Sequence, residues 1–375
     1  MILTDEQSAI QETVRAWAQD RVRPNAQSWE AAGGYPAELF PALAGLGLMG
    51  MTAPETYGGA GADYVSYALA LIELAAGDGG LSTLVSVHNA PVIAAILAEG
   101  NAAQKDRFLP ELCSGRSIGA FALTEPEAGS DASAVRTRAV RDGDGYIIDG
   151  SKQFVTSGRI CGLCLVFAVT DPAAAKRGLS AFIVPADTPG FEVAKVEHKL
   201  GQQASDTCAL NFNSMRVAAE VRLGDEGQGY RIALANLETG RIGIAAQSVG
   251  MAQAALAIAV TYAKERKTFG KPIVSHQAVG FRLADLAARL EAARQLVLHA
   301  ACLKDARRPC LTEASMAKLV ASETAEAVCS GAIQTLGGYG YMEEYGLAKI
   351  YRDVRVCQIY EGTSDIQRML IARNL

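Results

Sequence analysis

From Thr4 to about Arg116, apolar residues recur three or four positions apart, which is the spacing of an amphipathic helix. Thr4 is followed three residues later by Gln7, and this pair fits a capping box at the start of a first helix. Paired glycines such as Gly79-Gly80 interrupt the pattern, as expected between helices. The pattern predicts an all-α domain over residues 1–119.

Short apolar runs bounded by turn residues replace this pattern between residues 120 and 223. The runs lie at 146–150, 165–170, 180–184, 191–193 and 208–212. Asp142-Gly143-Asp144-Gly145 and Thr188-Pro189-Gly190 are turn signals between them. Close spacing of short runs and turns is typical of antiparallel sheets, so we expect a β-sandwich or barrel domain here.

After a glycine-rich segment at 224–229, helical spacing returns and continues to the C-terminus. One apolar stripe runs along residues 281–298 and consists of Leu283, Leu286, Leu290, Ala293 and Val297. Several such helices predict a four-helix-bundle domain over 224–375. The order helical, β, helical predicts an α+β multidomain fold with three domains in one chain.

The composition narrows the range of partners. The chain of 375 residues has 35 Lys and Arg against 40 Asp and Glu, a formal net charge of −5. This balance, without Lys/Arg-rich runs, argues against nucleic acid or an anionic membrane as the main partner. The best apolar stretch, 242–260, contains Gln247, Ser248 and Gln253, so we expect no membrane span. The first residues lack a signal-peptide pattern, and we therefore expect a bacterial cytoplasmic protein.

Cysteine and histidine usage gives no sign of a metal site. Eight cysteines in 375 residues are too dilute for a disulfide scaffold. Cys161 and Cys164 have CxxC spacing, but they lie in an apolar run, 160–169, that reads as a strand with the two side chains on opposite faces. The four histidines are scattered along the sequence, and we expect no metal ligand set.

Two short motifs match known serine nucleophile patterns. Residues 115–119 fit GxSxG around Ser117, but this pattern needs a strand before it and a helix after it, and the preceding residues read as a helix end. Ser315 and Lys318 fit SxxK within a helical segment, without the companion SDN and KTG elements. We interpret both matches as accidental.

Three further segments carry candidate chemistry. Residues 121–131 offer Thr124, Ser130 and the backbone around Gly129, hydroxyl and N–H donors that suit a phosphate or a polar ring edge. Residues 334–341 place glycines between helical segments, without the strand that a dinucleotide fingerprint requires. Taken singly, the first segment also fits a linker and the second fits helix-ending glycines.

The third segment, 358–365, sets Glu361 between apolar or aromatic residues and a glycine. A carboxylate so placed is a candidate general base if it is desolvated, although an ordinary surface glutamate is the commoner case.

Together the three segments resemble the acyl-CoA dehydrogenase family, and the resemblance covers essentially the whole chain. Residues 123–131 are similar to the first family signature, and residues 334–353, with Lys349 and Asp353, to the second. The stretch 239–245 resembles the short-chain and short branched-chain members. The resemblance implies a homotetramer with FAD bound between the β domain and the C-terminal bundle, helped by a neighbouring subunit.

The resemblance also implies a set of cofactor-binding residues. The flavin and its pyrophosphate would be lined by Phe121, Leu123, Thr124, Gly129 and Ser130, with Phe154, Val155 and Thr156 against the isoalloxazine. The family usually has Trp at the position of Phe154 and Glu or Gln at that of Asp365. The remaining members of the set are Arg266, Thr268, Phe269, His276, Gln277, Gln334, Gly337, Gly338, Thr363, Ser364 and Asp365.

The implied reaction is α,β-dehydrogenation of an acyl thioester. Glu361 would remove the α-proton while the β-hydrogen leaves as hydride to flavin N5, giving a trans-2-enoyl-CoA. The Glu361 backbone N–H and a flavin ribose hydroxyl would stabilise the thioester oxygen. Some family members carry the base at the position of Gly240. Glycine cannot act as a base, so Glu361 is the remaining candidate.

Substrate and partner expectations follow from the same resemblance. The implied substrate is a short-chain acyl-CoA, straight or branched, and the implied electron acceptor is an electron-transferring flavoprotein. The residues expected near the substrate are Ser130, Glu238, Arg241, Tyr360 and Gly362. The alternatives are a flavin acyl-CoA oxidase or carrier-bound aminoacyl dehydrogenase on the same fold, a serine acyl-CoA hydrolase using Ser117, and a non-catalytic binding module.

Overall fold

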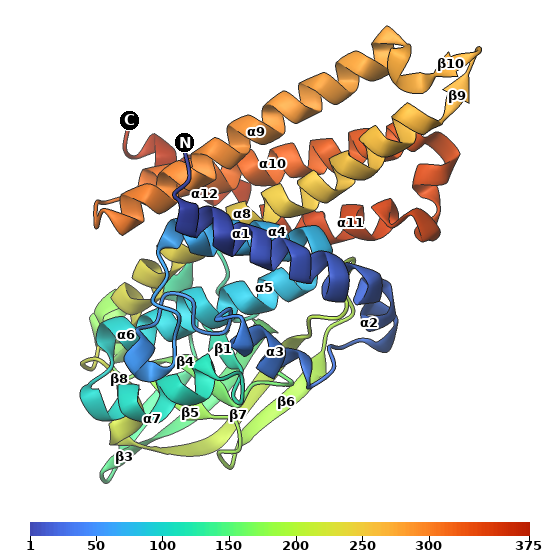
Figure 1. The fold of residues 1–375 in the computed structure, drawn as a ribbon. Helices are drawn as coiled ribbons and strands as arrows, with labels where there is room; N and C mark the ends of the chain where they lie inside the picture. Colours follow the sequence, from blue (N-terminus) through green and yellow to red (C-terminus); the bar gives the residue numbers. More distant parts are fainter.

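The computed structural model describes residues 1–375 and begins with a set of short helices (Figure 1). These are α1 (Asp5–Trp17), α2 (Ala26–Ala32), α3 (Leu39–Gly45), α4 (Tyr64–Gly77), α5 (Gly79–Val87), α6 (Ala94–Glu99) and α7 (Ala102–Cys113). The predicted capping box is confirmed, because the Thr4 side chain accepts from the Gln7 backbone and the Gln7 side chain accepts from the Thr4 backbone. Asp78 caps α5 through its side chain alone, which accepts from the Leu81 backbone N–H.

The middle of the chain forms one curled sheet of eight strands. They are β1 (Gly119–Ala122), β2 (Arg138–Asp142), β3 (Gly145–Thr156), β4 (Leu163–Val169), β5 (Leu179–Pro185), β6 (Phe191–Val196), β7 (Thr207–Ala218) and β8 (Arg222–Leu223). The order is β6-β7-β3-β2-β4-β5-β8, with β1 also paired to β4. The sheet is mainly antiparallel as predicted, while β1 and β2 run parallel to β4.

The C-terminal part is helical. Its elements are α8 (Gly229–Glu265), α9 (Gln277–Asp305), α10 (Leu311–Leu336), α11 (Leu347–Val354) and α12 (Ser364–Ala372). Between α8 and α9 the chain forms a small hairpin of β9 (Lys267–Thr268) and β10 (Lys271–Pro272), which projects at one end of the molecule (Figure 1). The predicted stripe on α9 is confirmed, because all five of its residues are buried.

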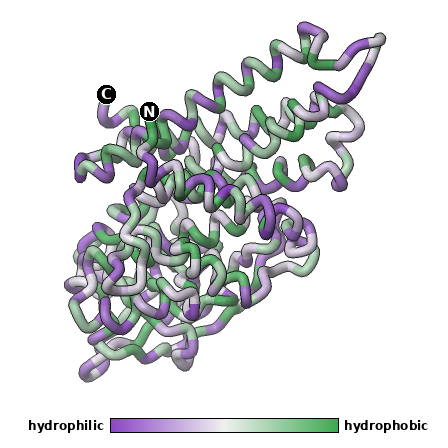
Figure 2. Tube along the Cα trace, in the orientation of Figure 1, coloured by the Kyte–Doolittle hydropathy of each residue, from purple (hydrophilic) through white to green (hydrophobic).

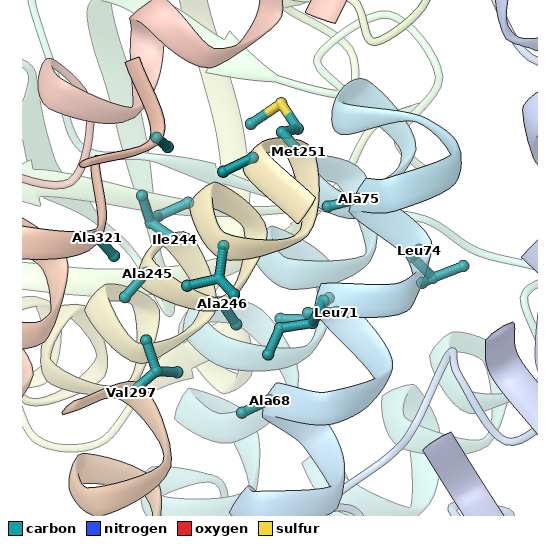
Figure 3. Close-up of a cluster of buried hydrophobic side chains, with 14 of the residues drawn as sticks. Ala68, Leu71, Leu74, Ala75, Ile244, Ala245, Ala246, Met251, Val297 and Ala321 are labelled. Carbon is teal, nitrogen blue, oxygen red and sulfur yellow. The ribbon is translucent and has the colours of Figure 1, made fainter. Parts of the chain in front are cut away.

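The largest apolar core joins the first and last parts of the chain. α8 packs between α4 and α10, and small side chains such as Ala68, Ala246 and Ala321 line the contact (Figure 3). The crossing of α4 and α8 is so close that a Cβ on Gly250 would lie 2.0 Å from the Ile72 carbonyl oxygen. Alanine or any larger residue at 250 would push the two helices apart.

The sheet has two differently covered faces. Alternate residues of β4 point to the two faces: Leu165 packs with α6 and α7, and Val166 packs inside the curled sheet. Because both faces are buried, β4 reads as a continuous apolar run rather than an alternating one. Apolar positions concentrate in the overlapping helices and strands, whereas polar positions dominate the projecting hairpin (Figure 2).

Two helical stretches, Gly79–Glu99 and Gly229–Glu265, are long and apolar enough to cross a membrane by length and composition. Most of each stretch is buried inside the fold, as in the core helices of other proteins that pass the same test. α8 extends well beyond the apolar stretch that the sequence singled out.

Cys161 and Cys164 do not lie in one strand, contrary to the prediction. Cys161 lies in the turn before β4 rather than in the strand, which begins at Leu163. Both thiols therefore pack in the same apolar cluster instead of on opposite faces. Burial raises the pKa of both thiols, that of Cys161 to about 12, which disfavours the reactive thiolate. All eight cysteines are free.

Candidate active site

Glu361 lies in a tight turn between α11 and α12, directly against α8. Its backbone is left-handed, with φ +52°, and Gly362 follows with φ +90°. This turn brings the carboxyl group against the backbone of Gly240, where an added Cβ would lie 1.9 Å from Glu361 Oε2. The glycine that the sequence singled out at 240 therefore supplies the space for the carboxyl group at 361.

The carboxyl group of Glu361 is desolvated. The residue as a whole keeps some exposure, but Oε2 is sealed from water and has no hydrogen-bond partner. Burial raises the pKa of Glu361 to about 7, against the opposing charges of Arg241 and Lys318. A carboxyl group of this pKa exchanges a proton near neutral pH, which suits a general base.

Of the residues expected at the substrate, Arg241 is the one with a buried polar atom that lacks a hydrogen-bond partner. Its side chain is only 5% exposed, and its Nε has no hydrogen-bond partner. Glu238 instead pairs with Lys304, with Nζ and Oε1 at 3.0 Å. The Tyr360 hydroxyl donates to Gln247 Oε1 at 2.7 Å.

Unpartnered polar atoms gather around the Glu361 turn. Besides Glu361 Oε2 and Arg241 Nε, the buried Ser364 Oγ and Gln367 Oε1 of α12 also have no partner. Buried polar groups are nearly always hydrogen-bonded, so a cluster of exceptions indicates a site that a ligand completes. Ser364 belongs to the expected cofactor set. Its neighbour Thr363 caps α12, and Asp365 is exposed and pairs with Arg368.

The loop after β1 is held by a buried ion pair. Lys152 of β3 is fully buried and its Nζ lies 2.8 Å from Glu125 Oε1. Glu125 also accepts hydrogen bonds from the backbone N–H groups of Arg136 and Thr137. Lys152 additionally donates to the Leu123 carbonyl, and Thr124 accepts from the Gln153 backbone. The pair thus fixes the loop that carries the expected flavin contacts to the strand that carries Phe154.

Strand β3 presents Phe154 outward through an irregularity. The β3–β7 register shifts between Lys152 and Val155, and Phe154 has φ +58° with 65% of its surface exposed. A bulge of this kind re-aims a side chain, and left-handed non-glycine residues concentrate at functional sites. Leu123 and Val155 bury their side chains in the core, so only their backbone atoms are available to a ligand.

The other expected residues of this region differ in exposure. Phe121 and Thr124 are partly buried, whereas Gly129 and Ser130 are exposed in the loop that follows. A Cβ on Gly129 would meet no atom within 4 Å, so the space beside that backbone is open.

A second group of expected cofactor residues surrounds an open cavity of about 730 Å³ at the hairpin end of α8. The expected residues that line it are Arg266, Thr268, Phe269, His276, Gln334, Gly337 and Gly338. The cavity is also lined by Tyr262, Tyr339 and Met342, which were not in the expected cofactor set, although the last two lie in the second signature. Phe269 is 96% exposed with φ +52°, and the Arg266 guanidinium lies 5.9 Å from the Tyr339 ring centre.

This cavity and the Glu361 carboxyl group lie far apart in one chain. Gly240 touches Glu361, whereas α8 ends beside the cavity at Glu265. At 1.5 Å per residue, the helix between these points is about 37 Å long. This cavity is therefore not the place of the candidate base. Gln277, at the start of α9, is exposed near the cavity end.

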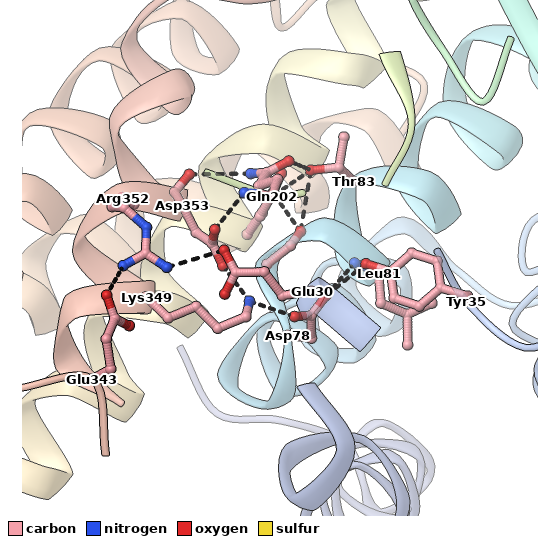
Figure 4. Close-up of polar contacts among 12 residues, drawn as sticks. Glu30, Tyr35, Asp78, Leu81, Thr83, Gln202, Glu343, Lys349, Arg352 and Asp353 are labelled. Carbon is pink, nitrogen blue, oxygen red and sulfur yellow. Dashed lines mark hydrogen bonds and ion pairs between the residues drawn. The ribbon is translucent and has the colours of Figure 1, made fainter. Parts of the chain in front are cut away.

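A buried polar network ties the three parts of the chain together (Figure 4). Lys349 of α11 contacts Asp78 at 2.7 Å and Asp353 at 2.5 Å. Asp353 accepts from the backbone N–H of Gln202, which follows β6. The Gln202 side chain continues the network to Thr83 of α5. Thr83 Oγ1 lies 3.3 Å from the hydroxyl of Tyr360, so the network reaches the residue before the candidate base.

Ser117 does not have the surroundings of a nucleophile. A strand, β1, follows it instead of preceding it, and α7 ends before it. The nearby His88 uses its ring nitrogens on the backbone of Met49, Leu112 and Gly119. His88 is therefore not available as a base for Ser117, in agreement with the interpretation of its motif as accidental.

Comparison with known proteins gives the class of protein. Models of the acyl-CoA dehydrogenase N-terminal, middle and C-terminal domains match residues 4–116, 120–215 and 227–375. An acyl-CoA dehydrogenase of Bacillus subtilis (strain 168) is 46% identical over 375 residues, which cover 100% of this chain and 99% of the relative. The chain belongs to the acyl-CoA dehydrogenase family and has its three-domain fold.

Solved structures agree with this assignment. Butyryl-CoA dehydrogenase from Megasphaera elsdenii superposes with a TM-score of 0.97 at 42% identity, covering 100% of this chain and 99% of that one. A chain described under "Electron transferring flavoprotein of Acidaminococcus fermentans: Towards a mechanism of flavin-based electron bifurcation" superposes with a TM-score of 0.98 at 41% identity, covering 100% and 98%.

Several residues of the site escaped the sequence reasoning. Lys152, Gln247 and Lys318 are buried polar residues that hold elements of the site in place. The sequence marks Lys318 only as the lysine of the SxxK match, which does not indicate a contact with the Glu361 turn. The only sequence signal for such residues is a lone polar position within an apolar helical or strand face.

Proposed function

We propose that this protein is an FAD-dependent dehydrogenase of short-chain acyl-CoA thioesters, with Glu361 as the base that removes the α-proton. The observation that carries the proposal is the isolated carboxyl group of Glu361, sealed at Oε2 and held against Gly240. Because burial brings its pKa to about 7, a large fraction is ionised and able to accept a proton near neutral pH.

The residues present fit FAD. The buried Ser364 Oγ has no hydrogen-bond partner, and the exposed aromatic rings of Phe154 and Phe269 offer stacking surfaces. When bound, FAD supplies the acceptor of the β-hydrogen as hydride, so that the product is a trans-2-enoyl-CoA. The protein's own contribution is to orient the thioester, hold the base and stabilise charge on the thioester oxygen through the Glu361 backbone N–H.

The separation of the two groups of cofactor residues supports assembly of the site between subunits. The cavity around Arg266 lies about 37 Å along α8 from Gly240. At this distance, the cavity residues are better placed to bind the cofactor of a neighbouring chain than that of their own. The exposed Phe269 and Phe281 of this end are apolar surface that a neighbour would cover. This reasoning supports the homotetramer implied by the family resemblance, and light scattering of the purified protein tests it.

The short acyl chain and the electron acceptor are further parts of the proposal. The relative named for butyryl-CoA supports a small, straight acyl group. A branched group of similar size differs by a methyl or methylene, a difference worth only about 1–3 kcal/mol in an apolar pocket. Similarity to a chain studied with an electron-transferring flavoprotein supports such a flavoprotein as acceptor.

Anaerobic titration of the purified flavoprotein with straight and branched acyl-CoAs tests the proposal. We expect bleaching of the oxidised flavin absorbance, strongest with short chains. Failure of every acyl-CoA to bleach the flavin would overturn the assignment of substrate class. Oxygen consumption with the best substrate distinguishes a dehydrogenase from an oxidase, and carrier-bound aminoacyl thioesters are the remaining arm of the panel.

A further inference from the structure

Lys318 is a fully buried cation beside the candidate base. It lies in the first third of α10, with Ala314, Ala317 and Ala321 along the same buried part of the helix. Its Nζ donates to the Gly362 carbonyl oxygen at 2.8 Å. An ammonium group is costly to bury unless it serves a partner, and its partner here is the backbone directly after Glu361.

The turn that Lys318 contacts is backbone that needs support. Glu361 is a non-glycine residue in the left-handed region, a conformation that persists only where surrounding contacts enforce it. Two side chains provide such contacts from different helices. Gln367 Nε2 donates to the Gly362 carbonyl at 2.8 Å and to the Glu361 carbonyl at 3.3 Å, and Lys318 holds the same Gly362 carbonyl.

The charged and titratable groups that face Glu361 come from three helices. Arg241 of α8 and Lys318 of α10 both lower the pKa of Glu361, and Tyr67 of α4 is neutral because burial raises its pKa. Lys318 in turn faces Cys357, Arg241 and Glu323. Burial lowers the pKa of Lys318 to about 8, which leaves most of the ammonium protonated at neutral pH.

We propose that Lys318 is a positioning residue, whose buried ammonium clamps the Glu361–Gly362 turn and favours the ionised form of the Glu361 carboxyl group. The serine of the same SxxK motif takes no part in this, because Ser315 Oγ donates to the Leu311 carbonyl within its own helix. The motif is thus not a nucleophile with its base, and its lysine serves a different carboxylate.

Three variants separate charge from hydrogen bonding. Lys318→Met removes both the charge and one donor to the Gly362 carbonyl, with a side chain of similar length. Gln367→Leu removes the other donor to that carbonyl and leaves the charge in place. Lys195→Met removes an exposed lysine of β6 that pairs with Glu197, as a control for net charge.

The first readout is the protonation state of Glu361. Infrared difference spectroscopy monitors it through the carboxyl stretching band, which is assigned by its absence in Glu361→Gln. We expect a midpoint near pH 7 in the wild type, in Gln367→Leu and in Lys195→Met. In Lys318→Met the midpoint should rise by about one unit, because an opposing charge is lost. A midpoint in Lys318→Met equal to that of the wild type would overturn the proposal.

The second readout rests on the proposed function. A rise of about one unit lowers the ionised fraction at pH 7 about fivefold, so the rate of flavin reduction should fall by that factor and recover at higher pH. A loss in Lys318→Met that is the same at every pH, with no shift of the profile, would contradict the charge role. If the wild type bleaches with no acyl-CoA, the proposed function falls, whereas the infrared comparison still decides the role of Lys318.

Discussion

Gly240 of α8 and Glu361 of the turn before α12 share one small volume, in which a Cβ at 240 would come within 1.9 Å of Glu361 Oε2. The two residues are 121 positions apart in the numbering, and the fold brings them into contact. The Glu361 carboxyl group can thus occupy this space only because residue 240 has no side chain.

Gly240→Ala should therefore displace the Glu361 carboxyl group. A misplacement of about 1 Å in a reacting group costs roughly 10²-fold in rate, and we expect a loss of that order in flavin reduction. Rapid-mixing measurement of the reduction rate checks this. Gly45→Ala in α3 is a matched control, because a Cβ there meets no atom within 4 Å. Wild-type reduction in Gly240→Ala would show that the carboxyl group does not use this space.

Glu361→Gln should stabilise the protein at neutral and alkaline pH. The folded protein holds the pKa of Glu361 near 7, above the 4.5 of an ordinary glutamate, so ionising it in the folded state is unfavourable. The contribution of Glu361 to the free energy of unfolding therefore falls as pH rises from about 4.5 to 7, by up to about 3 kcal/mol. The variant lacks this loss.

The measurement is the difference in thermal unfolding midpoint between variant and wild type at pH 5 and pH 8. The difference should be larger at pH 8. An equal difference at both pH values would mean that Glu361 does not titrate with a raised pKa.

Lys349→Met should destabilise the contact between the three domains. The substitution leaves the carboxyl groups of Asp78 and Asp353 buried without their cation (Figure 4), a change that costs about 3–5 kcal/mol in comparable buried pairs. Chemical unfolding checks the effect. Arg289→Met, at an exposed ion pair with Asp285, is the control and should change stability by less than about 0.5 kcal/mol. Equal effects of the two variants would contradict a structural role for the buried network.

Arg266→Gln should weaken FAD binding. Arg266 lines the cavity at the hairpin end of α8, and a charge-assisted hydrogen bond to a phosphate contributes about 1.5–3 kcal/mol, or roughly 10- to 100-fold in affinity. Flavin content after dialysis and reconstitution measures it. Arg282→Gln, a partly buried arginine of α9 outside the cavity lining, serves as control. Retention of FAD at the wild-type level in Arg266→Gln would remove Arg266 from the cofactor site.

The sequence could predict what depends on local pattern. The stripe from Leu283 to Val297 has a helical period, and the capping box at Thr4 is a local interaction; both are present in the structure. The parallel pairing of β1 with β4 was not foreseen, because β1 has only four residues and the crossover between them leaves no periodic signal. The start of β4 was misplaced for a related reason, since the turn at Cys161 is as apolar as the strand.

The site was predictable only in part. Glu361 stood out through its neighbours and the family resemblance, but its proximity to Gly240 is a long-range contact. Lys318 and Lys152 could not be recognised, because a sequence does not say which lysine in a helix or strand faces inward. Their burial depends on partners, Gly362 and Glu125, that lie elsewhere in the chain.

The central claim is that Glu361 removes the α-proton, and anaerobic reduction of Glu361→Gln by a short-chain acyl-CoA tests it most directly. The amide keeps the shape of the side chain but cannot accept the proton, so the variant should bind FAD normally and fail to bleach, a rate loss of about 10²–10⁴-fold or more. Bleaching of Glu361→Gln at the wild-type rate would contradict the account.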